Sequence, residues 1–160
     1  MTVADLLRKQ ATMRSDAPAL QDAQGVLSFA ELERWASRIA QALLASGVQA
    51  GERIAVLAEN RREYFGLQLA AAKIGAIVAC LNWRLADAEA AHCLRLVSPR
   101  LVFVSTRYAD VLVRIGWSDC PVIGLEAEFD GFVAPGIDAD PLLEVDAEQG
   151  LVILYTSGTT

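Results

Sequence analysis

Five residues at the end of the sequence, Thr156 to Thr160, carry four hydroxyl groups around a single glycine. They directly follow an apolar run with β-branched residues, Leu151 to Tyr155, which predicts a buried strand. A Gly/Ser/Thr loop after such a strand is typical of phosphate binding, because hydroxyl and backbone N–H groups at the carboxyl edge of an α/β sheet can donate to an anion. An isolated TSGTT segment would suit an ordinary turn equally well, so the preceding elements decide how it is interpreted.

Short apolar runs alternate with segments of helical periodicity over most of the sequence. Helices that separate successive strands imply βαβ units, since parallel strands need a crossover connection. The sequence therefore predicts an α/β fold, with a mostly parallel sheet and flanking helices. Strands are predicted at 53–58, 76–81, 101–104 and 121–125, and helices at 28–46, 61–74, 87–96 and 107–115.

The clearest local signal is a capping box formed by Ser28 and Glu31. The Ser28 hydroxyl can accept from the Glu31 amide while the Glu31 carboxylate reaches back to the start of the helix. Apolar residues then repeat at helical spacing until Gly47, which supplies the stop. Three further elements are predicted: a helix from Thr2 to about Met13, a hairpin turning at Gln24–Gly25, and a surface excursion over 126–148.

The composition favours a folded protein that does not bind nucleic acid. Of the 160 residues 54% are hydrophobic, and at this length folding buries roughly 70% of the unfolded surface. Fourteen Lys and Arg stand against 20 Asp and Glu, a net charge of −6, and no basic cluster offers contacts to a nucleic-acid backbone. The first residues lack the apolar core of a signal peptide, and no apolar stretch is long enough to span a membrane. We therefore expect a cytoplasmic protein with no transmembrane segment.

The candidate metal ligands are three cysteines and one histidine: Cys80, Cys93, Cys120 and His92. The cysteines are odd in number and widely spaced, and they form no CxxC motif. Cysteine often packs as a small apolar residue, so we predict packing here and no metal site.

Three further residues follow predicted strands and could take part in a site. Trp83 is interpreted as a packing residue in preference to a wall of an acyl pocket. Arg84 is interpreted as a surface or ion-pair residue, and Asn60 as the cap of the helix that follows it.

Several motifs, in consistent order and spacing, resemble the adenylate-forming enzymes, the acyl-CoA synthetase or AMP-binding superfamily. The segment LYTSGTT is similar to the opening of that family's phosphate-binding signature, which continues as G-x-P-K-G. The segment LSFAELERWASRIAQALLASGVQAGERIAVLAEN resembles its first core motif, AAKIGAIVACLNWRL its second, and LRLVSPRLVFV the segment after that. The resemblance covers about residues 17 to 160.

The resemblance implies that ATP and a carboxylic acid form an acyl-adenylate and pyrophosphate, and that the acyl group then passes to a thiol such as coenzyme A. It also implies a magnesium ion that bridges the phosphates. The segment GAIVACLNWRL is closer to acyl- and aryl-CoA ligases than to the amino-acid-activating relatives. No catalytic or metal-ligating residue can be assigned; the residues assigned to ATP phosphate binding are Thr156, Ser157, Gly158, Thr159 and Thr160.

The resemblance further implies that residues 1–160 are an amino-terminal fragment of the adenylation domain, an incomplete part of its large N-terminal domain that ends within the phosphate-binding motif. The acyl pocket and the C-terminal domain would lie beyond Thr160, so the fragment alone is expected to be inactive. Its uncovered apolar surface would favour self-association. A stand-alone nucleotide-binding α/β module and a non-catalytic interaction domain derived from the ligases remain alternatives. The acid that is activated is not specified by this sequence.

Overall fold

The structure, a computed structural model, describes residues 1–155, and the predicted alternation of helices and strands is present within them. The strands are β1 (Pro18–Asp22), β2 (Gly25–Ser28), β3 (Arg53–Leu57), β4 (Ile77–Cys80), β5 (Leu101–Val104), β6 (Val122–Gly124) and β7 (Val152–Leu154). The helices are α1 (Val3–Met13), α2 (Phe29–Ala45), α3 (Arg62–Ile74), α4 (Asp87–Val97), α5 (Ala109–Arg114) and α6 (Phe129–Val133), with a 3₁₀ turn η1 (Thr106–Tyr108) before α5.

Five strands form one parallel sheet in the order β6-β5-β3-β4-β7. Every residue of β5 and all but the first of β3 are buried, as expected for strands covered on both faces. The predicted α/β fold with a mostly parallel sheet is therefore confirmed.

The remaining two strands, β1 and β2, form a separate antiparallel hairpin. Asp22 pairs with Gly25, so the turn consists of Ala23 and Gln24, one residue earlier than predicted. Gly25 closes this turn with a φ of 123°, a conformation that L side chains rarely adopt.

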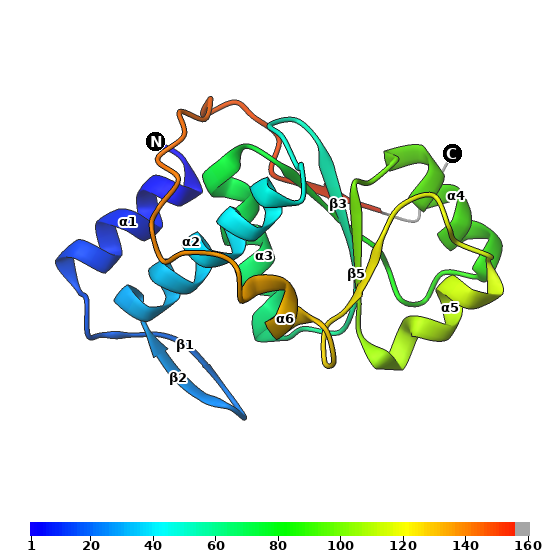
Figure 1. Cartoon of the computed structure of the whole chain (residues 1–160), viewed down its shortest axis with the longest axis horizontal. Helices are drawn as coiled ribbons and strands as arrows, with labels where there is room; N and C mark the ends of the chain where they lie inside the picture. Colours follow the sequence, from blue (N-terminus) through cyan, green and yellow to red (C-terminus); the bar gives the residue numbers. More distant parts are fainter. Residues whose placement is uncertain (156–160) are drawn as a thin grey trace.

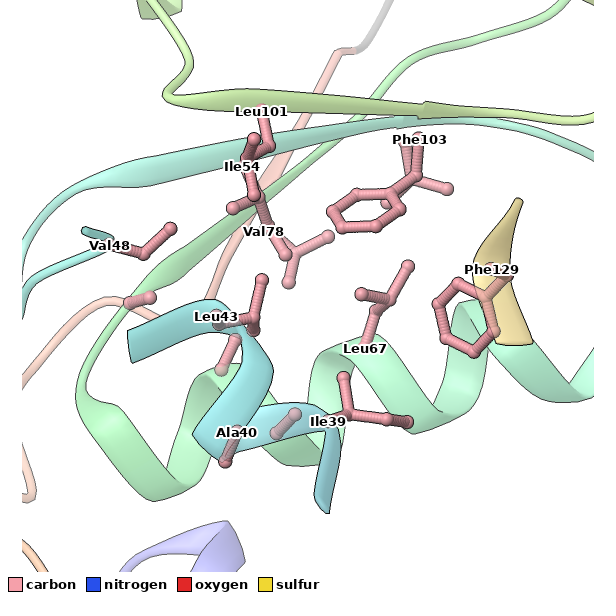
Figure 2. Packing of buried hydrophobic residues seen from close by; sticks show 14 of the residues in the cluster. Ile39, Ala40, Leu43, Val48, Ile54, Leu67, Val78, Leu101, Phe103 and Phe129 are labelled. Carbon is pink, nitrogen blue, oxygen red and sulfur yellow. The ribbon is translucent and has the colours of Figure 1, made fainter. Parts of the chain in front are cut away.

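Helices cover both faces of the sheet. On one face lie α2, α3 and α6, where Leu43, Leu67 and Phe129 pack against Ile54 and Phe103 of the strands (Figure 2). On the other face α4 and α5 close a second apolar cluster (Figure 1). The helix α1 lies on the first side, packed against α2 and α3. The sheet thus separates two cores, and each is closed by its own helix layer.

The strand β7 lies at the edge of the sheet and is not the buried strand that its sequence predicts. Val152 is 41% exposed and Leu154 is 69% exposed. Within residues 1–155, β7 pairs with β4 on one side and with no strand on the other. An apolar run indicates a strand, but the neighbours that bury a strand come from elsewhere in the fold.

The prediction of a surface excursion over 126–148 is wrong at its beginning. The helix α6 lies within this range, and its Phe129 and Val133 are buried in the core beside α2 and α3. An apolar pair at i and i+4 places both side chains on one face of even a short helix, which explains how α6 can join the core. From 134 to 148, all within the described chain, no residue is buried.

An ionic cluster around the buried Lys73 attaches the segment after α6 to three helices, and its other members are Glu33, Asp140 and Arg8. The Lys73 side chain is fully buried, and its ammonium donates to Glu33 at 2.7 Å and to Asp140 at 2.6 Å. Arg8 donates to both carboxylate oxygens of Asp140, at 2.7 and 2.9 Å. Burial alone would raise the pKa of Asp140, but the hydrogen bonds from Arg8 and Lys73 outweigh it and hold this pKa below its usual range.

The predicted capping box is present at the start of α2. The Ser28 amide donates to the Glu31 carboxylate at 2.8 Å, and the Glu31 amide donates to the Ser28 hydroxyl at 3.3 Å. We expect the double variant Ser28→Ala/Glu31→Ala to lower the free energy of unfolding by roughly 1–2 kcal/mol, measured by urea denaturation. Arg34→Ala, at an exposed position of the same helix, is the control. Equal stability of the double variant and the wild type would contradict the cap.

Candidate functional site

The carboxyl ends of the parallel strands meet at one edge of the sheet, which is the usual ligand side of open α/β sheets. There β3 leads towards Glu59, β5 into Ser105 and β7 into Tyr155. The predicted phosphate-binding residues Thr156–Thr160 come directly after Tyr155 in the sequence and lie outside the described residues. Their role therefore remains a prediction.

Hydrogen bonds fix the loops that follow β3, β5 and β6. The Ser105 hydroxyl is buried and donates to the Glu59 carboxylate at 2.7 Å. The Thr106 amide donates to Glu126 at 2.9 Å, and Arg61 forms an ion pair with the same Glu126. Side-chain hydrogen bonds and an ion pair therefore hold the loops after β3, β5 and β6 to one another at the carboxyl edge.

The start of α3 differs from the prediction that Asn60 caps it. The N-cap residue is Arg61, which makes no side-chain cap hydrogen bond, and its guanidinium donates to Glu63 at 2.7 Å. The capping role predicted for Asn60 is wrong, because the helix begins one residue later than such a role requires.

A cavity of about 440 Å³ opens at the same edge, between α3, the β1–β2 hairpin and the ends of β4 and β7. At its rim Arg62 forms an ion pair with Asp22, so charge there is balanced. Burial raises the pKa of Tyr64 above its usual range, which keeps this hydroxyl protonated. The lining is mainly uncharged and includes Tyr64, Phe65, Gln68, Cys80 and Leu154.

Two loops at the carboxyl edge present an aromatic ladder, which we define as Arg84, Trp83, Tyr108 and Arg107. Trp83, after β4, stacks on Tyr108, after β5, with ring centroids 6.0 Å apart and planes 19° apart. The Arg84 guanidinium lies 4.7 Å from the Trp83 ring centroid, and that of Arg107 lies 5.5 Å from the Tyr108 ring centroid. Trp83 is 45% exposed. Within residues 1–155 neither guanidinium forms an ion pair, so both are available to an anion.

A match to a known protein family shows to which family a chain with this edge belongs. The sequence model of the family described as AMP-binding enzyme matches residues 7–160. The chain belongs to the AMP-binding enzyme family. This agrees with the resemblance of its motifs to adenylate-forming enzymes.

Two relatives of the chain carry the names of ligases. A fatty acid–[acyl-carrier-protein] ligase of Streptomyces coeruleorubidus, ScoC, is 31% identical over 145 residues, which are 89% of this chain and 28% of that protein. The indoleacetate–CoA ligase of Aromatoleum aromaticum is 29% identical over 171 residues, covering 100% of this chain and 33% of that protein. The chain therefore spans about a third of the length of these relatives.

Solved structures of the family have the same fold. The N-terminal domain of FACL13 from Mycobacterium tuberculosis superposes with a TM-score of 0.91 at 26% identity, over 98% of this chain and 42% of that chain. A fatty acyl CoA synthetase of the same organism gives a TM-score of 0.91 at 26% identity, over 98% of this chain and 32% of that chain. The parallel sheet and its flanking helices thus match the fold of the N-terminal domain in these two structures.

Among the described residues, His, Cys, Asp and Glu side chains form no group of three or more that could hold a metal ion. None of the described helices is both long and apolar enough to cross a bilayer.

No role is predicted from the sequence for two tyrosines of the edge, Tyr108 and Tyr155. An arginine beside an aromatic residue follows both β4 and β5, in Trp83–Arg84 and in Arg107–Tyr108. This repeated pairing after two strands is the signal that could have located the ladder. Trp83 packs on Tyr108, as the sequence predicts for a packing residue. The prediction did not include that nearly half of the Trp83 side chain is exposed.

Proposed function

We propose that the whole protein is an AMP-forming acid–thiol ligase that activates a carboxylic acid with ATP and transfers the acyl group to coenzyme A. The observation that supports this most is that β7 leads to the carboxyl edge, from where the sequence continues into the hydroxyl-rich residues Thr156–Thr160. Family membership and the ligase names of the relatives support the same reaction class.

In this reaction the acid's carboxylate attacks the α-phosphorus of ATP, and pyrophosphate leaves with its negative charge. We assign the hydroxyls of Thr156, Ser157, Thr159 and Thr160 to hold the phosphates, because donors already aimed at developing charge lower the barrier most. Gly158 lets the backbone approach the phosphates closely. A magnesium ion arriving with ATP would neutralise part of the phosphate charge.

The aromatic ladder supports coenzyme A as the acceptor. Coenzyme A carries an adenine base and several phosphate groups at one end. An exposed ring such as Trp83 offers a stacking surface for a base. The Arg84 guanidinium, which forms no ion pair within residues 1–155, suits a phosphate. An acyl carrier protein, the acceptor named for the Streptomyces relative, is the second candidate.

Arg84→Ala in the whole protein is expected to raise KM for coenzyme A about tenfold, the loss of one charge-assisted phosphate contact. Acid-dependent exchange of pyrophosphate into ATP should stay unchanged, because that half-reaction does not involve the thiol. Arg95→Ala, at an exposed position near the other end of α4, is the matched control. If KM for coenzyme A is the same in both variants, the ladder is not its binding site.

The reaction itself is tested by incubating the whole protein with ATP, magnesium, coenzyme A and a panel of fatty and aryl acids. We expect AMP, pyrophosphate and acyl-CoA in equal amounts for at least one acid. Nucleotide binding without turnover would favour a stand-alone nucleotide-binding module, and the absence of ATP binding would favour an interaction domain. Residues 1–160 alone are expected to give no turnover.

A further inference from the structure

The last described residue of the chain, Tyr155, attaches the end of β7 to a helix. We propose that Tyr155 is a positioning residue for ATP, whose hydroxyl fixes the point at which the phosphate-binding loop begins. This inference rests on the proposed function, because it assigns a task only if Thr156–Thr160 bind phosphate.

The attachment is a hydrogen bond between the residue that follows β7 and the helix α4. The Tyr155 hydroxyl donates to the backbone carbonyl of Cys93 in α4, at 2.9 Å. Its ring is half-buried and packs against the apolar cluster beneath α4 and α5. Burial raises the pKa of Tyr155, so the hydroxyl stays protonated and able to donate at neutral pH.

The residues just before Tyr155 show why this hydrogen bond matters for the loop that begins at Thr156. Pairing between β4 and β7 ends at Cys80 and Leu154, so strand pairing no longer holds the chain at Tyr155. Leu154 is 69% exposed and adds little packing among the described residues. The Tyr155 hydroxyl therefore provides the attachment immediately before Thr156.

A fixed starting point matters because the loop must hold its donors against the phosphates at hydrogen-bond distance. Ordering a segment costs conformational entropy, and a segment that is already anchored at one end pays less of it on binding. A neutral hydrogen bond is worth roughly 0.5–1.5 kcal/mol, which corresponds to about a twofold to tenfold change in an equilibrium constant.

The test is Tyr155→Phe in the whole protein, which keeps the ring and removes only the hydroxyl. We expect kcat/KM for ATP in pyrophosphate exchange to fall about threefold to tenfold, with KM for the acid within about twofold of the wild type. Calorimetry with a non-hydrolysable ATP analogue should show a matching loss of affinity, independently of turnover.

Thr12→Val is the matched control, since the Thr12 hydroxyl also donates to a helix carbonyl, that of Arg8 at 3.0 Å, on the distant α1. It should leave all kinetic constants unchanged. Wild-type affinity for ATP in Tyr155→Phe, or an equal loss for ATP, acid and coenzyme A, would overturn the positioning role. Absence of exchange in the wild type would instead overturn the proposed function, and the positioning role with it.

Discussion

Replacing Lys73 by methionine is expected to lower the free energy of unfolding by about 3–5 kcal/mol at neutral pH. Methionine fills much of the same space, so the loss arises from charge. Glu33 and Asp140, whose side chains are 18% and 14% exposed, would lose the ammonium that lies 2.7 and 2.6 Å from their oxygens. Asp140 would keep its two hydrogen bonds from Arg8, but Glu33 would become a mostly buried carboxylate without a cation, which is costly. Urea denaturation measures the loss directly.

Lys9→Met, an exposed lysine of α1, controls for the change of residue type and should change the unfolding free energy by less than about 0.5 kcal/mol. The triple variant Lys73→Met/Glu33→Gln/Asp140→Asn removes both carboxylates as well, and we expect it to recover part of the loss. If the free energy of unfolding of Lys73→Met lies within about 1 kcal/mol of the wild-type value, the ionic cluster does not hold the segment after α6 in place.

Replacing Gly158 by valine is expected to lower the rate of acid-dependent pyrophosphate exchange about 100-fold or more in the whole protein. If Thr156–Thr160 bind phosphate as proposed, a branched side chain at this position would keep their backbone N–H groups away from the phosphates. Stability should change far less, because a loop residue contributes little to the core. The measurement is exchange of labelled pyrophosphate into ATP, alongside thermal unfolding.

Gly131→Val is the control for the same replacement at an exposed glycine, where an added Cβ meets no atom within 4 Å. It should keep exchange near the wild-type rate. A Gly158→Val enzyme that retains exchange within threefold of the wild type would remove the loop from the mechanism.

Local signals were sufficient to predict most elements of the fold. The capping box at Ser28 and the stop near Gly47 both depend on contacts within a few residues, and the structure shows both. The parallel sheet is expected from alternating strands and helices, whose crossovers leave few topologies. The family's phosphate signature likewise depends on a contiguous motif.

The features that the sequence did not show depend on residues far apart along the chain. Lys73 lies in an apolar helix, but its partners Glu33 and Asp140 are 40 and 67 residues away. The ladder needs the ends of β4 and β5, which have β3 between them in the sheet, to bring Trp83 beside Tyr108. The exposure of β7 depends on which strands flank it, and its own residues do not encode that.

The central claim is that the acid's carboxylate attacks the α-phosphorus of ATP. The most direct test supplies the whole protein with an acid labelled with ¹⁸O in both carboxylate oxygens, together with ATP and coenzyme A, and analyses the products by mass spectrometry. An acyl-adenylate keeps one labelled oxygen between carbon and phosphorus, and thiol attack at the carbonyl carbon then leaves that oxygen on AMP. We predict AMP with one ¹⁸O atom and unlabelled pyrophosphate. Label in inorganic phosphate, with ADP as the nucleotide product, would contradict the claim.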